Sequence, residues 1–234
     1  MMPANDKGQG MLKNLWNKAK AWEKARNKSY EKPIVTAEDR ERAHYYAKWI
    51  DHGFLRVRWT NFDQIAEGVY RSNHPSPERM AEMAEMGIKT VINLRGGANI
   101  PTSLLSAEAA EKYGMKVITI GMSARSAPNP RQIVEFMDVM ETAEKPVLIH
   151  CKSGADRTGL AAVIYLTEML GVSVEDASAH LSSKYLHFKW SKTGVLDLFF
   201  ENYRKAHDAT GIGLREWVTT VYDQDALNRE FAAR

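Results

Sequence analysis

The sequence predicts an α/β protein with a central, largely parallel β-sheet flanked by helices, and with extra helices at its N- and C-terminal ends. Segments of strand length alternate with segments of helical periodicity along most of the 234 residues, which is typical of a sheet built from βα units. The apolar segments 88–95 and 145–150 lack polar alternation, as do strands buried on both faces. Residues 158–170 are apolar on all sides, which indicates a buried helix.

The N-terminal part is predicted to be helical after a disordered start. Residues 1–10 are polar and glycine-bearing, and we expect them to be disordered. Residues 11–26 show the pattern of an amphipathic helix. Its apolar side carries Leu12, Leu15, Trp16, Ala19 and Trp22. A second helix is expected from Thr36, which Asp39 would help to cap, to just before Gly53.

Beyond Gly53, strands and helices alternate up to a helical C-terminal part. Strands are predicted at residues 54–59, 68–72, 88–95, 115–122 and 145–150. Helices are predicted at residues 76–87, 103–113, 133–140, 158–170, 174–183, 191–207 and 214–231. Proline in the first turn and glycine after the last turn mark the helix at 76–87 most clearly, with Pro77 and Gly87 in these positions.

Composition excludes several classes of protein. A single cysteine excludes an internal disulfide and a multi-cysteine metal site, and it favours a reducing, cytosolic compartment. The seven histidines form no metal-binding pair, so neither a metal nor a cofactor is expected. No apolar run is long enough to span a bilayer, and no signal peptide is visible.

Charge is distributed unevenly along the chain. The segment 7–32 contains eight Lys or Arg and two Glu, a local net charge of +6. Because the whole chain carries +3, the remainder carries −3. We therefore expect no nucleic-acid partner for the main domain.

The segment HCKSGADRTG, residues 150–159, carries the chemistry. A buried strand delivers Cys151 to the carboxyl end of the sheet, and the loop runs directly into the N-terminus of a helix, whose free amides attract anions. Gly154 permits the torsions that let successive loop amides converge on a phosphate. Arg157 could hold two phosphate oxygens, and with the helix terminus it favours the thiolate of Cys151. A thiolate below a bound phosphate is placed for in-line attack on phosphorus.

This H-C-x5-R-T-G pattern resembles the signature of the cysteine-dependent protein tyrosine and dual-specificity phosphatases, and residues 68–96 are similar to the entry region of bacterial members. The resemblance covers roughly residues 62–186 and implies the cysteine phosphatase fold. It implies that Cys151 forms a phosphocysteine intermediate and that Arg157 stabilises both transition states. Thr158 would donate its hydroxyl to the sulfur, and His150 would fix the loop through a backbone contact. The phosphate is expected on the loop residues, which are Lys152, Ser153, Gly154, Ala155, Asp156 and Arg157.

Three domains follow from this interpretation. Residues 1–53 form a basic, amphipathic helical extension, residues 54–207 form the phosphatase domain, and residues 208–234 form a C-terminal helix that packs on it. For the extension two alternatives stay open. Residues 11–28 either pack their apolar side on the protein or contact an anionic membrane at the inner face. The sequence does not indicate an oligomeric state.

The family's usual general acid, an aspartate on a loop before the cysteine, is missing. Residues 116–134 contain no Asp or Glu, and Asp138 is expected to be a solvated charge on a helix. Asp156 resembles the aspartate of Asp-Arg loops, such as those of myotubularin-like phosphatases, to which the acid role is assigned. The alternatives are that Asp156 only caps the helix or orients Arg157, or that an upstream residue such as Asp63 is the acid.

Substrate choice is left open between phosphoproteins and phospholipids. Phosphotyrosine or phosphoserine proteins follow from the family resemblance. A lysine after the cysteine, here Lys152, resembles phosphoinositide-directed members, although the second lysine of those loops is Ala155 here. Three arginines could add positive charge to the site, and each could equally be solvated or structural: Arg95, Arg125 and Arg131. A catalytically inactive phosphate-binding module and a rhodanese-like sulfurtransferase are remote alternatives.

Overall fold

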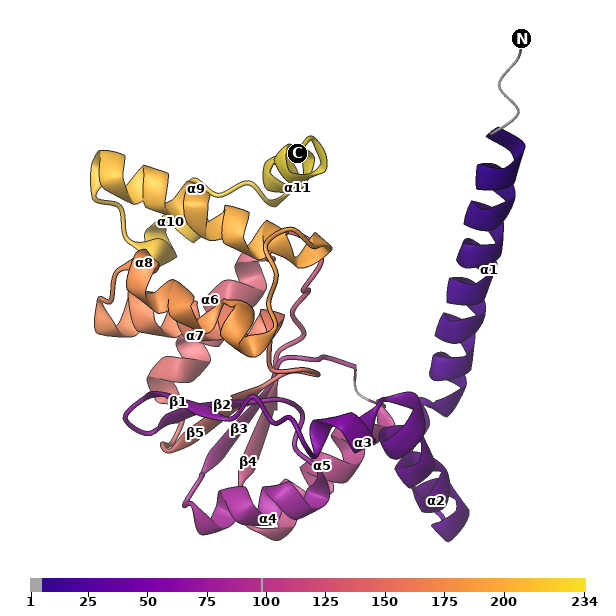
Figure 1. Ribbon diagram of the computed structural model, residues 1–234. Helices are drawn as coiled ribbons and strands as arrows, with labels where there is room; N and C mark the ends of the chain where they lie inside the picture. The colour runs from indigo at the N-terminus through magenta and orange to yellow at the C-terminus, as the bar shows by residue number, and fades with distance from the viewer. Residues whose placement is uncertain (1–5, 98) are drawn as a thin grey trace. The chain divides into compact units, whose positions relative to one another are not determined.

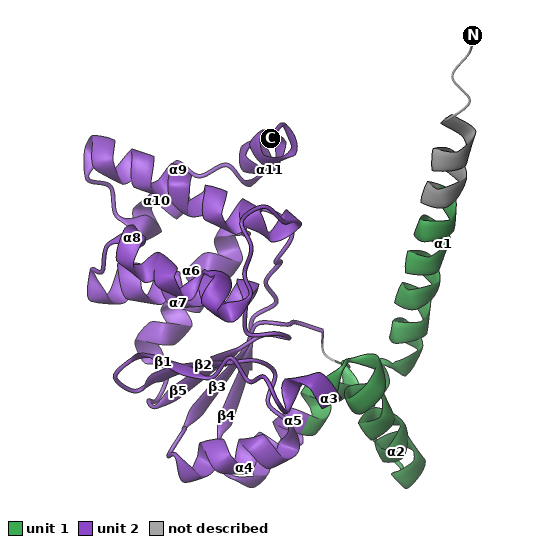
Figure 2. Ribbon diagram, in the orientation of Figure 1, with its two compact units in different colours: residues 1–53, 98–105 green, residues 54–97, 106–234 purple. Residues whose placement is uncertain are grey.

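The computed structural model describes residues 6–97 and 99–234, with side chains described from residue 14 onward. The chain divides into two compact units (Figure 2). One contains Met1–Gly53 and Ala98–Leu105, and the other contains Phe54–Gly97 and Ser106–Arg234. The three-domain division inferred from the sequence stays a prediction.

The first unit is helical. Helix α1 spans Asp6–Tyr30, α2 spans Ala37–Tyr45, and a π-helix, η1, covers Tyr46–Ile50. Residues 6–10, for which the sequence predicts disorder, instead form the first turns of α1, whereas residues 1–5 lie outside the described part. The capping box of α2 is confirmed, because the Asp39 amide donates to Thr36 Oγ1 at 3.1 Å and the Thr36 amide donates to Asp39 Oδ2 at 3.0 Å.

The apolar side predicted for α1 is exposed where its side chains are described. Leu15, Trp16 and Trp22 are all exposed, and Leu12 lies outside the described side chains. Lys20 lies over the Trp16 ring at 4.9 Å and Arg26 over the Trp22 ring at 5.0 Å, so each indole carries a cation on its face.

The second unit is built on a five-stranded sheet of order β1-β2-β5-β3-β4 (Figure 1). Its strands are β1 Asp63–Ala66, β2 Val69–Ser72, β3 Thr90–Asn93, β4 Lys116–Thr119 and β5 Val147–His150. Strand β1 pairs antiparallel with β2, and the other pairs are parallel. All residues of β3 and β5 are buried, as their unbroken apolar segments predict. The predicted α/β fold with a largely parallel sheet is confirmed.

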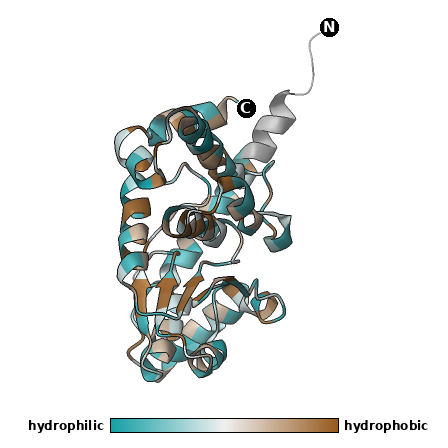
Figure 3. Cartoon of the chain, turned by 90° about the vertical axis from the view of Figure 1, so that its left-hand side faces the viewer, coloured by the Kyte–Doolittle hydropathy of each residue, from teal (hydrophilic) through white to brown (hydrophobic). Residues whose placement is uncertain are grey.

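Helices cover both faces of this sheet. On one face lie α6 (Pro130–Thr142) and α7 (Asp156–Leu170), and α10 (Leu214–Thr220) packs on both of these helices and on α9 (Val195–Thr210). The other packs against α4 (Pro77–Glu85) and the second half of α5 (Pro101–Lys112). The strands between these layers are among the most hydrophobic segments of the chain (Figure 3). The four apolar residues expected on the inner face of α6 are all buried: Ile133, Phe136, Met137 and Met140.

Short helical segments complete the unit. They are α3 Gly53–Arg56, α8 Val174–Ala177, the 3-10 helices η2 Ser178–His180, η3 Ser183–Tyr185 and η4 Lys192–Gly194, and α11 Gln224–Ala232. Within residues 6–97 and 99–234, no helix is both long enough and apolar enough to cross a bilayer.

Three local predictions were wrong. Residues 54–59 form no strand, because the amides of Arg58 and Trp59 both donate to Leu55 O at 3.3 Å and close a helical turn. The helix predicted at 214–231 is interrupted at Asp223, whose carboxylate accepts from two amides that follow it and starts α11. The helix predicted at 174–183 is only α8 followed by η2. Strand β1, a short edge strand, was not predicted.

The register of the sheet gathers three chain segments at one edge. Ser72, His150 and Asn93 lie side by side at the carboxyl ends of β2, β5 and β3. The loops that leave these strands therefore meet at this edge, which is where parallel sheets carry their ligand sites.

Candidate active site

The segment between β5 and α7 forms a tight loop around the Cys151 sulfur. Strand β5 ends at His150 and α7 begins at Asp156. The Gly154 amide donates to Cys151 Sγ at 3.3 Å, with Gly154 at a φ of +75°. A Cβ at Gly154 would lie 2.7 Å from the Asn73 nitrogen and 2.8 Å from Asn61 Cβ, so only glycine fits here.

The thiol of Cys151 is buried and electrostatically activated. Burial raises the pKa of Cys151. The charge of Arg157, the hydroxyl and amide of Thr158 and the amide of Gly154 lower it by more than burial raises it, so the pKa lies below its ordinary value. Among the described residues the buried Thr158 hydroxyl has no hydrogen-bond partner, and it is one of the groups that lower the pKa of Cys151. The environment favours a thiolate.

Arg157 is anchored on one side and unpaired on the other. Its Nη1 donates to Leu94 O, at the end of β3, at 3.2 Å. Its Nε is buried and has no partner within the described chain. A buried N–H without an acceptor is costly, so this nitrogen indicates a ligand with oxygen acceptors.

A layer of polar side chains beneath the loop fixes its carbonyl groups. The Arg71 guanidinium, fully buried on β2, donates to Gly154 O and to His180 O, each at 2.5 Å, and lies 3.4 Å from the centre of the Tyr185 ring. Asn61 Nδ2 donates to Ser153 O at 2.8 Å. With these carbonyls held from below, the loop amides are free to turn towards an anion above the sulfur.

His150 lies in a setting where it stays neutral. Burial, followed by the charges of Arg95 and Arg157, lowers the pKa of His150 to about 3, despite a backbone contact that raises it. Its Nδ1 lies 3.3 Å from Cys151 O, and its ring meets the His74 ring edge-on at 4.7 Å. The His150 ring is therefore enclosed and neutral.

Asp156 is part of a chain of three side chains. Its Oδ1 lies 2.8 Å from His187 Nδ1, and His187 Nε2 lies 2.7 Å from Asp197 Oδ2. The His187 side chain is fully buried, whereas Asp156 is 23% exposed and Asp197 8% exposed. Burial lowers the pKa of His187, but hydrogen bonds to both carboxylates raise it more, to about 9.

The other carboxylates considered as the acid are already engaged. Asp63 Oδ2 accepts from Tyr185 OH at 2.6 Å and from Lys184 at 2.7 Å. Burial raises the pKa of Asp63, but these two hydrogen bonds lower it to about 2, so this carboxyl is ionised. Asp138 forms an ion pair with Arg215 at 2.6 Å on the surface of α6.

The remaining predicted residues divide between the site and other surfaces. Lys152 O accepts from the His74 amide at 3.2 Å, and Ser153 Oγ accepts from the Ala155 amide at 3.3 Å, so both help to shape the loop. Arg95 lies beside it, with Nη1 3.3 Å from His74 Nδ1.

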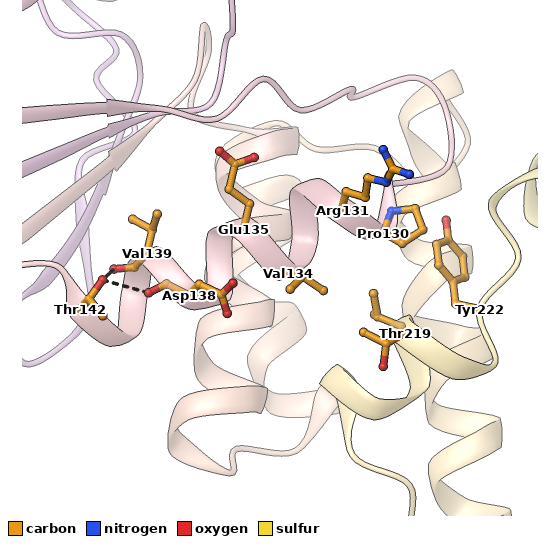
Figure 4. Close-up of a pocket in the computed structure, with 10 residues that line it drawn as sticks. Pro130, Arg131, Val134, Glu135, Asp138, Val139, Thr142, Thr219 and Tyr222 are labelled. Atoms are coloured by element: carbon orange, nitrogen blue, oxygen red, sulfur yellow. Dashed lines mark hydrogen bonds between the residues drawn. The ribbon is translucent and has the colours of Figure 1, made fainter.

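Two arginines lie elsewhere. Arg125 is exposed on the loop before α6. Arg131 lines a groove of about 750 Å³ between α6 and α10 (Figure 4), in which no residue of the loop between β5 and α7 takes part. Among the residues that the structure describes, no cluster of three or more His, Cys, Asp or Glu is arranged to hold a metal ion.

Sequence reasoning missed four residues of the site, because each joins the loop from a distant part of the chain. Asn61 reaches Ser153 across 92 positions, Arg71 reaches Gly154 across 83, and His187 reaches Asp156 across 31. Asp197 is linked to the loop through its hydrogen bond with His187. The one available signal was an arginine inside a strand that is otherwise buried, in VYRS.

This chain resembles known proteins in sequence and in fold. A family model described as "DSP-PTPase phosphatase fused to NAD+ Kinase" matches residues 59–192. Inositol diphosphatase DSP4 of Arabidopsis thaliana is 33% identical over 112 residues, which are 46% of this chain and 55% of that protein. Inositol diphosphatase DSP2 of Oryza sativa subsp. japonica is 24% identical over 116 residues, 47% of this chain and 55% of that protein. The chain thus spans about half the length of these curated relatives.

Solved structures share the fold. TpbA of P. aeruginosa superposes with a TM-score of 0.52 at 18% identity, over 74% of this chain and 91% of that one. The catalytic core of the PP-IP phosphatase SIW14 of S. cerevisiae superposes with a TM-score of 0.50 at 18% identity, over 64% of this chain and 93% of that one.

Proposed function

This chain belongs to the family described as DSP-PTPase phosphatase fused to NAD+ kinase, and from this membership and the geometry of the loop we propose that it hydrolyses phosphate monoesters through a phosphocysteine intermediate. Cys151 attacks phosphorus, and Arg157 and the loop amides hold the equatorial oxygens. The observation that carries the proposal is the pairing of a buried thiol of lowered pKa with a buried Arg157 Nε that has no acceptor among the described residues.

The roles of the other site residues follow from their contacts. The Thr158 hydroxyl stabilises the sulfur as it leaves in the second step. Lys152, Ser153, Gly154 and Ala155 form the loop that encloses the phosphate. His150, neutral and buried, supports that loop.

We assign the general acid to Asp156. It stands at the first position of α7 beside Arg157, at the rim of the loop, and is partly exposed where a leaving group would depart. Asp63 already accepts a hydrogen bond from Tyr185 and is ionised, which argues against Asp63 as the general acid.

A chromogenic phosphate ester tests the proposal. We expect the wild-type chain to release phosphate from p-nitrophenyl phosphate and Cys151→Ser to release none, with vanadate binding retained when measured by calorimetry. Full turnover by Cys151→Ser would overturn the proposal. Absence of turnover by the wild-type chain would favour a phosphate-binding module, and release of sulfite from thiosulfate and cyanide would favour a sulfurtransferase.

Two substrate classes remain as proposals. Phosphotyrosine or phosphoserine proteins follow from the family description. Phosphorylated inositol head groups, free or in phospholipids, are favoured by Lys152 in the loop and by relatives named inositol diphosphatases. Phosphate release from a panel of phosphopeptides, inositol phosphates and phosphoinositides, compared as kcat/KM, separates the classes.

Location and membrane contact can be tested apart from activity. The single cysteine supports a reducing, cytosolic location. The exposed Trp16 and Trp22 with their neighbouring cations support contact of α1 with anionic lipid. Co-sedimentation with phosphatidylserine vesicles that is lost when residues 1–32 are removed would support membrane contact, and no sedimentation of the full chain would support packing on protein.

A further inference from the structure

His187 connects the phosphate loop to a second, buried carboxylate. It lies in the segment between η3 and η4, and its two ring nitrogens face carboxylates from two different helices, Asp156 at the start of α7 and Asp197 in the first turn of α9. The ring is fully buried. A histidine in such a position has no solvent to exchange protons with directly, so its protons move through Asp156 or Asp197.

The hydrogen-bond pattern requires one proton in each link. A carboxylate only accepts hydrogen bonds, so contacts of 2.8 Å to Asp156 and 2.7 Å to Asp197 each need a hydrogen between nitrogen and oxygen. The group therefore holds two protons, either as an imidazolium between two carboxylates or as a neutral imidazole beside one protonated carboxyl. In both forms a proton lies next to Asp156.

The surrounding charges keep both protons bound to this group at neutral pH. The titratable groups that face His187 from every packed element are Asp156 on α7, Asp197 on α9 and, through Asp197, Lys189 of its own segment at 3.6 Å. The hydroxyl of Thr193, on η4, lies 3.4 Å from Nδ1. Two carboxylates outweigh burial and hold the pKa of His187 at about 9, so the proton stays bound through the neutral range.

We propose that His187 is a positioning residue for catalysis, which supplies through Asp156 the proton that the leaving group takes and takes back the proton that water gives up. This rests on the proposed function, with Asp156 as the group that touches substrate. It explains how a chain without an acidic residue at 116–134 still provides an acid: the proton is stored on a buried imidazole behind the carboxyl.

The two steps balance in protons and electron pairs. In the first, Cys151 bonds to phosphorus and the ester P–O bond breaks with its electron pair on the leaving oxygen. The proton between His187 Nδ1 and Asp156 passes through Asp156 to that oxygen, which leaves Asp156 ionised. The imidazole is then neutral and still donates Nε2–H to Asp197. In the second, water bonds to phosphorus, the S–P bond breaks with its electron pair on sulfur, and the proton of water returns through Asp156 to His187.

Leaving-group dependence tests this proposal. We expect His187→Asn to lower kcat/KM for phenyl phosphate, whose leaving group needs a proton, by about 10²-fold. The kcat/KM for p-nitrophenyl phosphate should change by no more than about threefold. We also expect the basic limb of the phenyl phosphate pH profile to move to lower pH, because the imidazole that holds the proton behind Asp156 is then absent. Vanadate affinity should be unchanged, which shows that the loop is intact.

Four further variants make the result decisive. Asp156→Asn should show the same discrimination between substrates, and the double variant no additional loss, since the two residues act as one unit. Asp197→Asn keeps the imidazole but removes one charge, and it should move the same limb to lower pH even if His187→Asn fails to fold. His207→Asn, an exposed histidine on α9, serves as the matched control with unchanged rates.

The outcomes separate this inference from the proposed function. Equal losses on both esters, or an unmoved basic limb in both His187→Asn and Asp197→Asn, overturn the role of His187 while the wild-type phosphatase activity stands. No phosphate release from either ester by the wild-type chain overturns the proposed function, and the inference with it.

Discussion

At the scale of single residues, the environment of Cys151 determines its chemistry. Burial alone would make this thiol inert, because desolvation disfavours the charged form. The charge of Arg157, the hydroxyl of Thr158 and the amide of Gly154 outweigh burial and lower the pKa. Cys151 is therefore buried, yet its electrostatic surroundings favour the ionised form of the thiol.

Alkylation measures this balance directly, because Cys151 is the only cysteine of the chain. We predict that its rate of reaction with iodoacetate, followed by intact mass, has a midpoint pH below the ordinary thiol value of about 8.5. Arg157→Ala should raise the midpoint, since it removes the largest of the effects that lower the pKa. Arg131→Ala, in the groove between α6 and α10, is the control and should leave it unchanged. A wild-type midpoint at or above about 8.5 would contradict an activated thiol.

At the scale of elements, the phosphate loop between β5 and α7 keeps its shape because β2 and the segment before β1 pack against it. Gly154 is in contact with the backbone of Ser72 and Asn73, and its carbonyl is held by Arg71. The loop is thus fixed from below by backbone and by a buried cation. The conformation of the loop therefore depends on these contacts at the sheet edge as much as on the loop's own sequence.

Replacing the loop glycine should therefore weaken both binding and turnover. We predict that Gly154→Ala lowers kcat/KM for p-nitrophenyl phosphate by at least about tenfold and weakens vanadate binding, because its Cβ would lie 2.7 Å from the Asn73 nitrogen and its φ is +75°. Gly87→Ala is the matched control. It shares a positive φ of +80° but has nothing within 4 Å, so it should lower stability without changing kcat/KM. Equal kinetic effects of the two variants would show that backbone torsion alone, and not the contact, is responsible.

The fold was predictable where local pattern and burial agree. Strands β3 and β5 are buried on both faces and consist of unbroken apolar segments in the sequence, and Pro77 and Gly87 mark the ends of α4. Residues 54–59 alternate like a strand, but Leu55 and Val57 are exposed and no described strand pairs with them. Strand β1 escaped prediction because four residues at a sheet edge carry little pattern.

The site was predictable only where its residues are consecutive. Residues 150–158 belong to one strand–loop–helix motif, so the sequence alone predicts that Cys151, Asp156 and Arg157 lie together. Arg71 and His187 come from other segments, and a lone arginine or histidine carries no sign of the partner it meets after folding. The supporting contacts of an active site are the part that sequence pattern least reveals.

At the scale of the whole molecule, His187 joins the segment before α9 and α9 itself to the start of α7, so its ionisation should influence the stability of the second unit. Its pKa of about 9 in the folded chain lies above the ordinary 6.5. A raised folded pKa contributes stability that is fully present below pH 6.5 and is lost as the pH rises through about 9. Cys151 acts in the opposite sense, because its folded pKa is lowered and it adds stability as the pH rises.

The contribution of His187 can be isolated in a Cys151→Ser background, where the opposing thiolate is absent. We predict that between about pH 6 and 9.5 the free energy of unfolding in urea falls by up to about 3 kcal/mol more in Cys151→Ser than in Cys151→Ser/His187→Asn, because folding raises the pKa of His187 from 6.5 to about 9. Cys151→Ser/His207→Asn should follow the parent, because His207 is exposed and lies at the far end of α9. If the parent and the His187 variant lose stability in parallel, the imidazolium between Asp156 and Asp197 does not form, and the proton store proposed for catalysis is absent as well.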